Sequence, residues 1–315
     1  MDRVDVFIAN LYQAIQSGHI EDFRDYALRE MRRLVPFDAA LWGSGGYGSQ
    51  AFHSVATQGV DRDYVSALER TRPLNPMLAA LIATPGHAID MRSLLGDDRF
   101  HHSPIYKQCF SRFGVQRLVS YLDCSPQTGV HSLISLYRFD QDRPFTDAER
   151  ALFERAAFHL VAAASHALFM HVCTLAHADD DDERFAICDR HGLLYQSEPG
   201  FRDLLERVFG ISSSRGLPFD LPARGECENA RGLCVEARPM GDLFSVRIWR
   251  RRAIDGLAGR DRAIVDGVCR GMTFKDIGRE LQLAPSTISN RLYRVYRELG
   301  VTSRSSLVRL IHGQG

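Results

Sequence analysis

The chain has 315 residues, of which 45% are hydrophobic, and its 39 basic residues balance 39 acidic ones. This is the composition of a soluble protein, and the length suits two or three domains with cores of their own. The sequence shows no signal peptide and no Cys-x-x-Cys pair, and we expect no apolar run long enough to span a membrane. We therefore expect a cytoplasmic protein without disulfides or a membrane partner.

Helical and strand patterns alternate over the first 145 residues. Apolar residues at helical spacing, such as Val4, Leu11 and Ile15, predict a first helix, and a second is expected over 20–34. The sequence then predicts strands at 39–43, 51–57, 118–124 and 131–138, with helices at 62–70, 75–83 and 103–113. This order predicts an α/β (α+β) domain around an antiparallel sheet.

This region resembles the GAF sensory fold. The resemblance rests on Val35-Pro36-Phe37-Asp38-Ala39-Ala40, on Phe113-Gly114-Val115 before a strand, on the strand 133–137 and on the closing segment 143–150. It implies a pocket for a small-molecule effector of open identity, with no resident cofactor expected. The candidate lining residues, taken from the central strands and the segment that covers them, are Trp42, His53, Tyr106, Phe110, Tyr121 and Ser135.

Thr146 and Glu149 have the spacing of a capping box and predict a helix over about 147–178. At 1.5 Å per residue it would be roughly 45 Å long and would extend beyond the core of the sensor domain, 1–172. It is therefore a candidate dimerisation and signal-transmitting rod. A stripe of His159, His166, Cys173 and His177 runs along it. We favour packing against a partner helix and predict no metal site; a metal- or redox-responsive sensor at this stripe is the alternative.

Residues 179–249 form the next predicted domain, after an acidic run at 179–183 that indicates a solvated linker. A strand, a turn with Asp189 and Gly192, and a second strand lead to a helix over about 200–209 and strands at 232–238 and 243–249. The order resembles a shortened PAS domain. The resemblance implies a degenerate PAS-like α+β spacer, which is followed by an arginine hinge at 250–252.

The last predicted domain, 250–315, has the pattern of an all-α helix-turn-helix. Thr273 and Asp276 form an acidic variant of the capping box, and Gly278 lies where two steeply crossing helices need a small residue. Ile288, Leu292 and Val295 give the second helix its buried face. The residues expected to contact DNA lie on or beside the outward face of that helix: Lys275, Ser286, Thr287, Ser289, Asn290, Arg291, Arg294 and Arg297.

Four motifs in this domain resemble LuxR-type (GerE-type) transcriptional regulators. They are Leu257-Ala258-Gly259-Arg260-Asp261-Arg262, the segment from Gly271 to Gly278, Thr287-Ile288-Ser289-Asn290-Arg291, and Leu299-Gly300-Val301-Thr302-Ser303-Arg304. The resemblance implies a bacterial regulator that binds double-stranded DNA as a homodimer on a two-fold related site. It also implies pairing through the final helix, at Arg304, Leu307, Val308 and Ile311. Ala284 departs from the usual capping serine, a loss of about 1 kcal/mol unless Ser286 takes over.

Charge supports this division, because residues 250–315 hold thirteen Lys and Arg against six Asp and Glu. No Gly-x-Ser-x-Gly elbow or Walker loop occurs, so we expect no enzyme. Acyl-homoserine-lactone receptors share this DNA-binding end, but Trp42 lacks the tyrosine that follows in their Trp-x3-Tyr pair, which disfavours that ligand. A constitutive DNA-binding protein with a purely structural first domain is a further alternative.

Overall fold

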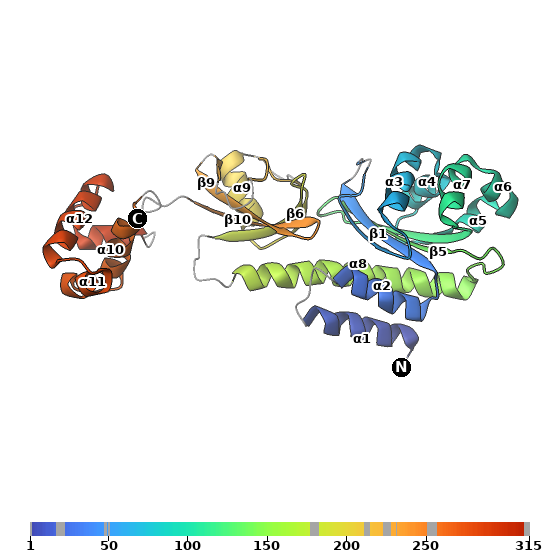
Figure 1. Cartoon of the computed structure of the whole chain (residues 1–315), viewed down its shortest axis with the longest axis horizontal. Helices are drawn as coiled ribbons and strands as arrows, with labels where there is room; N and C mark the ends of the chain where they lie inside the picture. Colours follow the sequence, from blue (N-terminus) through green and yellow to red (C-terminus); the bar gives the residue numbers. More distant parts are fainter. Residues whose placement is uncertain are drawn as a thin grey trace. The chain divides into compact units, whose positions relative to one another are not determined.

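The computed structural model describes residues 2–16, 23–46, 49, 51–176, 183–210, 215–222, 228–230, 232–250 and 257–311. The chain forms two compact units, Met1–Trp249 and Arg250–Gly315 (Figure 1). The first unit combines two β-sheets with helices, whereas the described part of the second is helical. The predicted multidomain fold class, mixed α/β followed by all-α, is confirmed.

The first sheet has five strands, all antiparallel, in the order β2-β1-β5-β4-β3. They are β1 (Ala39–Gly46), β2 (Ser54–Gln58), β3 (Ala88–Asp90), β4 (Arg117–Cys124) and β5 (Val130–Arg138). Successive side chains of a strand point to opposite faces, so Leu41 and Trp42 of β1 enter different hydrophobic cores. The sheet thus separates two apolar layers.

Helices cover both faces of this sheet. On one face a single core joins the sheet to α2 (Phe23–Leu34) and α8 (Asp147–Ala176), and α1 (Arg3–Gln16) packs on these two helices. Short helices cover the other face: α3 (Arg62–Arg70), η1 (Arg72–Leu74), α4 (Pro76–Ala83), α5 (Met91–Leu95), α6 (Asp97–His102), α7 (Pro104–Gln108) and η2 (Phe110–Phe113). Figure 1 shows the long helix α8 on one side of the sheet and α3 to α7 on the other.

The second sheet repeats the strand order of the first. Its order is β7-β6-β10-β9-β8, so in both sheets the first strand along the chain lies between the second and the fifth. The elements are β6 (Arg184–Asp189), β7 (Leu194–Ser197), α9 (Phe201–Phe209), β8 (Glu228–Ala230), β9 (Leu233–Met240) and β10 (Leu243–Arg250). Helix α9 covers one face through the buried Phe201, Leu204 and Leu205.

Helix α8 packs against both sheets. Its first five turns bury Phe153, Leu160 and Ala163 in the core beside the first sheet. Further along, Val172 is fully buried against Phe185 and Ile187 of β6. The predicted helix is confirmed to Ala176, and its last two expected residues lie outside the described ranges.

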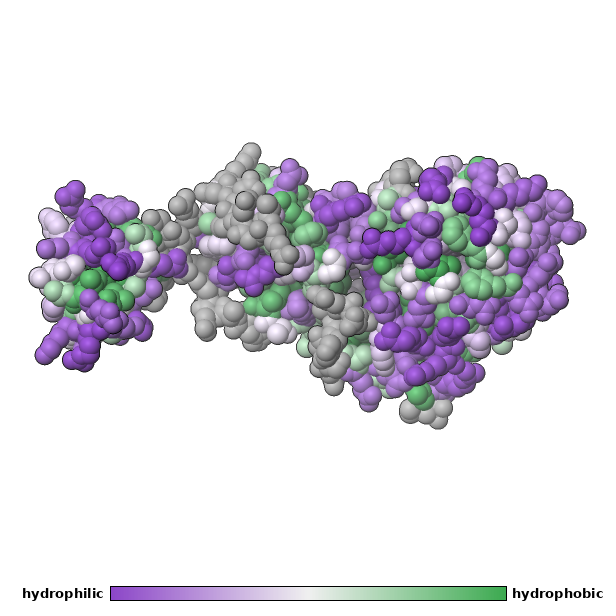
Figure 2. Space-filling model, viewed as in Figure 1, coloured by the Kyte–Doolittle hydropathy of each residue, from purple (hydrophilic) through white to green (hydrophobic). Residues whose placement is uncertain are grey.

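Contrary to the expectation of no apolar run of sufficient length, α8 satisfies the length and composition criteria for a membrane span over residues 147–175, with a mean hydropathy of 1.5 in its most apolar 18-residue window. A core helix passes the same test, so the criterion by itself is weak support for a span. Phe153, Leu160 and Val172 are fully buried against other parts of the first unit. Figure 2 shows hydrophilic residues over most of the visible face of that unit.

Five short elements, η1, β3, α5, α6 and β8, have no counterpart in the sequence pattern, because three to six residues are too few to reveal a period. The helix expected over 103–113 is two helices. At Cys109 the backbone leaves the helical region (φ −124°, ψ −74°), and η2 follows. The helix expected over 20–34 is described from Phe23 onward.

Arg138 fixes the start of α8 to the sheet. Its side chain is 4% exposed, and its guanidinium donates to the carboxylate of Glu149 at 2.6 Å and to the carbonyls of Pro36 and Pro144 at 2.8 and 2.9 Å. Glu149 also accepts from the backbone N–H of Thr146, which completes the predicted capping box. Burial alone would raise the pKa of Glu149, but the hydrogen bonds from Arg138 and Thr146 outweigh it and lower that pKa.

Replacing Glu149 by Gln should therefore destabilise the first unit by about 1.5 kcal/mol at neutral pH, the usual worth of a charged hydrogen bond. A carboxyl group whose pKa is depressed by folding stabilises above its unfolded value, near 4.5. The difference between wild type and E149Q should thus shrink as pH falls below that value. Urea unfolding followed by tryptophan fluorescence measures it, because Trp42 and Trp249 both lie in the first unit.

The matched control is D147N, because the Asp147 side chain is 95% exposed and should change stability by less than about 0.5 kcal/mol. A stability difference for E149Q that stayed constant from pH 7 to pH 3 would contradict the role assigned to this ion pair.

Candidate DNA-binding surface and small-molecule pocket

The second unit contains α10 (Gly259–Cys269), α11 (Phe274–Leu281), α12 (Pro285–Glu298) and α13 (Arg304–Ile311). The capping box at the start of α11 is present, since the Thr273 hydroxyl accepts from the Asp276 N–H and the Asp276 carboxylate accepts from Thr273. Helices α11 and α12 are joined by a turn of three residues whose first, Gln282, is left-handed with φ 54°.

Gly278 is required by this turn. A Cβ at Gly278 would lie 2.5 Å from the carbonyl oxygen of Leu283, well inside van der Waals contact. The Leu283 N–H donates to the Gly278 carbonyl at 2.8 Å, which holds the turn against α11. The sequence assigns this glycine to the crossing of two helices, whereas the structure shows that the turn backbone leaves no room for a side chain.

One face of α12 is buried and the opposite face is free. Ile288, Leu292 and Val295 pack into the core of the unit. The opposite face carries exposed residues about one helical turn apart: Ser286, then Ser289 and Asn290, then Tyr293 and Arg297. Tyr293 is 67% exposed and was not among the residues expected to contact DNA, although its spacing from Asn290 and Arg297 identifies the same face. Ala284 precedes α12 without a side-chain cap, and Ser286 supplies none.

Two of the predicted DNA-contact residues are engaged inside the unit. Arg291 and Arg294 donate to the two carboxylate oxygens of Asp261 on α10, at 2.8 and 2.7 Å. The Asp261 side chain is only 7% exposed. Burial would raise its pKa, but the two arginine hydrogen bonds outweigh burial and lower it. Arg291 therefore ties α12 to α10 and does not point outward as expected, whereas Arg294 keeps 61% of its side chain exposed.

The final helix also differs from expectation. Leu307 is fully buried in the core of its own unit, and Ile311 packs against the same core. The guanidinium of Arg304 donates to the Val268 carbonyl at 2.8 Å. Of the residues proposed for dimer contacts, Leu307 is thus unavailable and Arg304 is anchored within the unit, while Val308 is half-buried. Leu310 is 43% exposed.

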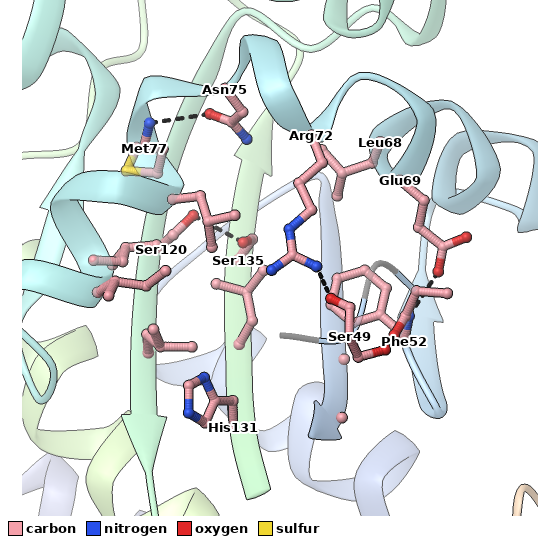
Figure 3. Close-up of a pocket in the computed structure, with 18 of the residues that line it drawn as sticks. Ser49, Phe52, Leu68, Glu69, Arg72, Asn75, Met77, Ser120, His131 and Ser135 are labelled. Carbon is pink, nitrogen blue, oxygen red and sulfur yellow. Dashed lines mark hydrogen bonds between the residues drawn. The ribbon is translucent and has the colours of Figure 1, made fainter. Parts of the chain in front are cut away.

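The first unit contains a cavity of about 280 Å³ between the first sheet and helices α3 and α4 (Figure 3). Two of the six expected lining residues, Phe110 and Ser135, border it. Trp42 and Tyr121 do not, because they lie on the α8 face of the sheet. Tyr106 instead donates to Gln116 at 2.9 Å, and His53 contacts Asp189 of the second sheet.

The cavity has several lining residues that the sequence did not single out. His131 and Leu133 precede Ser135 by four and two residues on β5, so strand alternation from Ser135 would have identified them. Ser120 and Ser135 hydrogen-bond to each other at 2.8 Å. Arg72 reaches toward the sheet and donates to the backbone carbonyl of Ser49 (Figure 3). Burial, followed by the charge of Arg72, lowers the pKa of His131.

Polar contacts join the first sheet to the second. His53 Nδ1 donates to the carboxylate of Asp189, which is itself fully buried, and its other ring nitrogen lies 2.9 Å from the Ser49 hydroxyl. The Val55 N–H donates to Asp242 at 3.1 Å. Close by, Arg24 of α2 donates to the hydroxyls of two serines, Ser44 and Ser54, at 2.9 and 3.0 Å. The two sheets are therefore joined by hydrogen bonds as well as by α8.

The His/Cys stripe on α8 forms no ligand cluster within the described residues, where no group of three His, Cys, Asp or Glu could hold a metal ion. His166 lies against the ring of Tyr12 at 5.9 Å between centroids. His177 lies outside the described ranges.

A family model for bacterial regulatory proteins of the luxR family matches residues 255–311. These residues are a LuxR-type helix-turn-helix domain, the DNA-binding part of a transcription regulator, which confirms the resemblance found in the motifs. Comparison with curated proteins gives no match.

Several solved structures show a distant similarity to the chain, among them the following three. The VqsR LBD domain from Pseudomonas aeruginosa is 16% identical over 53% of this chain and 96% of that one, with a TM-score of 0.39. The N-acylhomoserine lactone dependent factor CepR2 from Burkholderia cenocepacia is 14% identical over 52% and 94%, at 0.37. A GAF domain/HD domain protein from Geobacter sulfurreducens is 15% identical over 53% and 98%, at 0.34. Similarity at this level supports no argument about ligand or mechanism.

Replacing Arg291 by Ala should destabilise the second unit by about 1.5–3 kcal/mol, because the nearly buried Asp261 carboxylate loses one of its two charged hydrogen bonds. Hydrogen exchange of the amides in α10 and α12 measures this loss in the full chain. The matched control is R297A, since Arg297 is exposed and forms no ion pair within the described residues; it should change stability by less than about 0.5 kcal/mol. Equal protection in R291A and wild type would contradict a structural role for Arg291.

Proposed function

We propose that this protein is a cytoplasmic, non-enzymatic transcription regulator that binds a two-fold related operator as a homodimer and responds to a small molecule in the first unit. The observation that carries the proposal is the LuxR-type domain at 255–311 with a free outer face on α12. Ser286, Ser289 and Asn290 would read base edges in the major groove, and Tyr293 and Arg297 extend the same face. Lys275 and Thr287, beside it, are proposed to contact phosphates.

Charge supports DNA as the partner. Residues 250–315 carry a net charge of +7, while the first 249 residues carry −7. A basic unit releases counterions from the phosphate backbone when it binds, so its affinity depends on salt. The acidic remainder does not compete for the same phosphates. Arg294 can take part in this attraction, because more than half of its side chain is exposed despite its bond to Asp261.

The free face of α8 supports a dimer. Phe158, Ala162, Ser165 and Phe169 follow one another at spacings of four, three and four residues, the repeat of a coiled-coil seam. None of the four is buried, and Phe158 is 57% exposed. The same face of a second copy is the proposed occupant, because the two-fold related site expected for this domain requires two copies. The seam takes over the dimer contacts that Leu307 cannot make.

The cavity supports an effector rather than a purely structural first unit. A volume of about 280 Å³ is open beside the sheet, close to the lower end of the roughly 300–1,000 Å³ typical of ligand sites. The cavity wall includes Ser49, which contacts His53, and His53 contacts Asp189 of the second sheet. A ligand in the cavity can therefore alter these contacts between the sheets and shift the population of DNA-competent dimers.

Replacing Arg297 by Ala should weaken DNA binding several-fold while the fold is kept. If Arg297 contacts one phosphate, the slope of log affinity against log salt should fall by about 0.9. Fluorescence anisotropy on an operator selected from random oligonucleotides measures both quantities. R62A, an exposed arginine of the first unit, is the matched control and should leave them unchanged. Unaltered affinity and slope for R297A would contradict the proposed face.

Replacing Phe158 by Glu should shift the protein from dimer to monomer, because it places two carboxylates opposite each other in the seam. Sedimentation equilibrium at micromolar concentrations should show a dissociation constant raised at least tenfold, on the order of 1.4 kcal/mol. L74E is the matched control, since Leu74 is 39% exposed on η1, which covers the face of the first sheet opposite α8. A dimer as tight as wild type in F158E would rule out α8 as the interface.

A further inference from the structure

The cavity in the first unit has one cationic group and a mostly apolar wall. We propose that it takes a small organic monocarboxylate with an aliphatic or aromatic body, and that Arg72 holds the carboxylate. This inference rests on the proposal that the cavity is the effector site, and it names the chemical class of that effector.

Arg72 is the cationic group in the cavity that an anionic ligand would bind. Its side chain hangs from η1 over the cavity, between Ser135 and Phe52 (Figure 3). The interaction shown for its guanidinium is a single hydrogen bond to the neutral carbonyl of Ser49. No carboxylate lies within 4.0 Å of it among the described residues, and the residues next to Ser49 that lie outside the described ranges, Tyr47, Gly48 and Gln50, are not acidic.

A half-buried guanidinium without a counter-ion is unfavourable in apolar surroundings, and a carboxylate satisfies it with two parallel hydrogen bonds. Glu69, the acidic residue that borders the cavity, is not a counter-ion for Arg72. Its carboxylate accepts from the Phe52 N–H at 2.8 Å and points away from Arg72 (Figure 3). The donors of Arg72 that Ser49 does not use are therefore open to a ligand.

The other polar groups favour a single negative charge. Burial and the nearby Arg72 lower the pKa of His131, so His131 is neutral at pH 7 and adds no second cation. The hydroxyls of Ser120 and Ser135 hydrogen-bond to each other at 2.8 Å and carry no charge. Recognition of charge in the cavity thus falls to one arginine, which matches one carboxylate.

The remaining wall suits an apolar body. Side chains from α3, α4, η2 and the central strands border the cavity: Leu68, Met77, Leu81, Phe110, Leu122 and Leu133. Burial of apolar surface contributes about 25 cal/mol per Å². The cavity volume of about 280 Å³ admits a chain of roughly eight to ten carbons or an arylalkanoate and excludes much larger ligands.

Binding of the carboxylate by Arg72 can affect contacts that lead to the second sheet. A carboxylate that binds the open donors of Arg72 also draws the guanidinium away from the Ser49 carbonyl. Ser49 also contacts His53, which donates to Asp189 on β6. The neutral amide of the same acid lacks the charge that would displace Ser49, so we expect it to leave this chain of contacts intact.

The test is isothermal titration of the full-length protein with 4-phenylbutyrate and decanoate, each compared with its neutral amide. Wild type should bind at least one of these acids at least tenfold more tightly than its amide. R72Q should lose at least tenfold in affinity for that acid and bind the amide as wild type does, while R72K, which keeps the charge, should lose less. R70Q is the matched control, because Arg70 is exposed on α3 and does not border the cavity.

L78W tests whether the ligand binds in this cavity. Leu78 borders the cavity and is only half-buried, so a tryptophan there should fill the space without unfolding the protein, and it should abolish binding. Equal affinity for acid and amide, undiminished acid binding by R72Q, binding retained in L78W, or no binding of either acid would each overturn the proposal.

DNA affinity measured in the same samples separates this inference from the proposed function. DNA binding without binding of either acid would refute the ligand class and leave the regulator intact. Acid binding that depends on Arg72 but leaves DNA affinity unchanged would uphold the ligand class and refute the effector role.

Discussion

Helix α8 is part of two hydrophobic cores at once, and the arrangement of the first unit depends on that. Phe153 and Leu160 belong to the core of the first sheet, and Val172 to the core beside the second. Each fully buried apolar side chain of this size contributes about 1.5–3 kcal/mol, so neither sheet can leave the helix without exposing several of them. The hydrogen bond from His53 to Asp189 adds a polar tie between the sheets. The two sheets, though similar in strand order, therefore behave as one body.

This constraint places the proposed sensing and dimer functions on the same scaffold. The cavity lies on the face of the first sheet away from α8, while the seam around Phe158 lies on the free side of α8 itself. A change at the cavity can reach α8 through the sheet or reach β6 through Ser49 and His53. The second unit, in contrast, has its own core and its own ion pairs at the buried Asp261, so it can keep its fold independently of the first unit.

Local signals in the sequence were sufficient for the helix-turn-helix of the second unit and for α8. The capping boxes at Thr273 and Thr146, and the apolar spacing around Ile288, depend on residues within one or two turns of each other. The cavity depends on which face of a strand each residue occupies, and the aromatic Trp42 and Tyr121 were assigned to the wrong face. Arg291 illustrates a second limit. Its spacing suits the outer face, but its partner Asp261 is thirty residues away and is brought near only by folding.

The central claim, that α8 unites both sheets in one cooperative body separate from the DNA-binding unit, can be tested most directly by native-state hydrogen exchange across a denaturant series. The slowest amides of β5 in the first sheet and of β6 and β10 in the second should share one free energy of opening and one denaturant dependence, while those of α12 follow a different one. A distinct, lower opening free energy for β6 and β10 would contradict the claim, because the second sheet would then unfold while α8 stayed packed on the first.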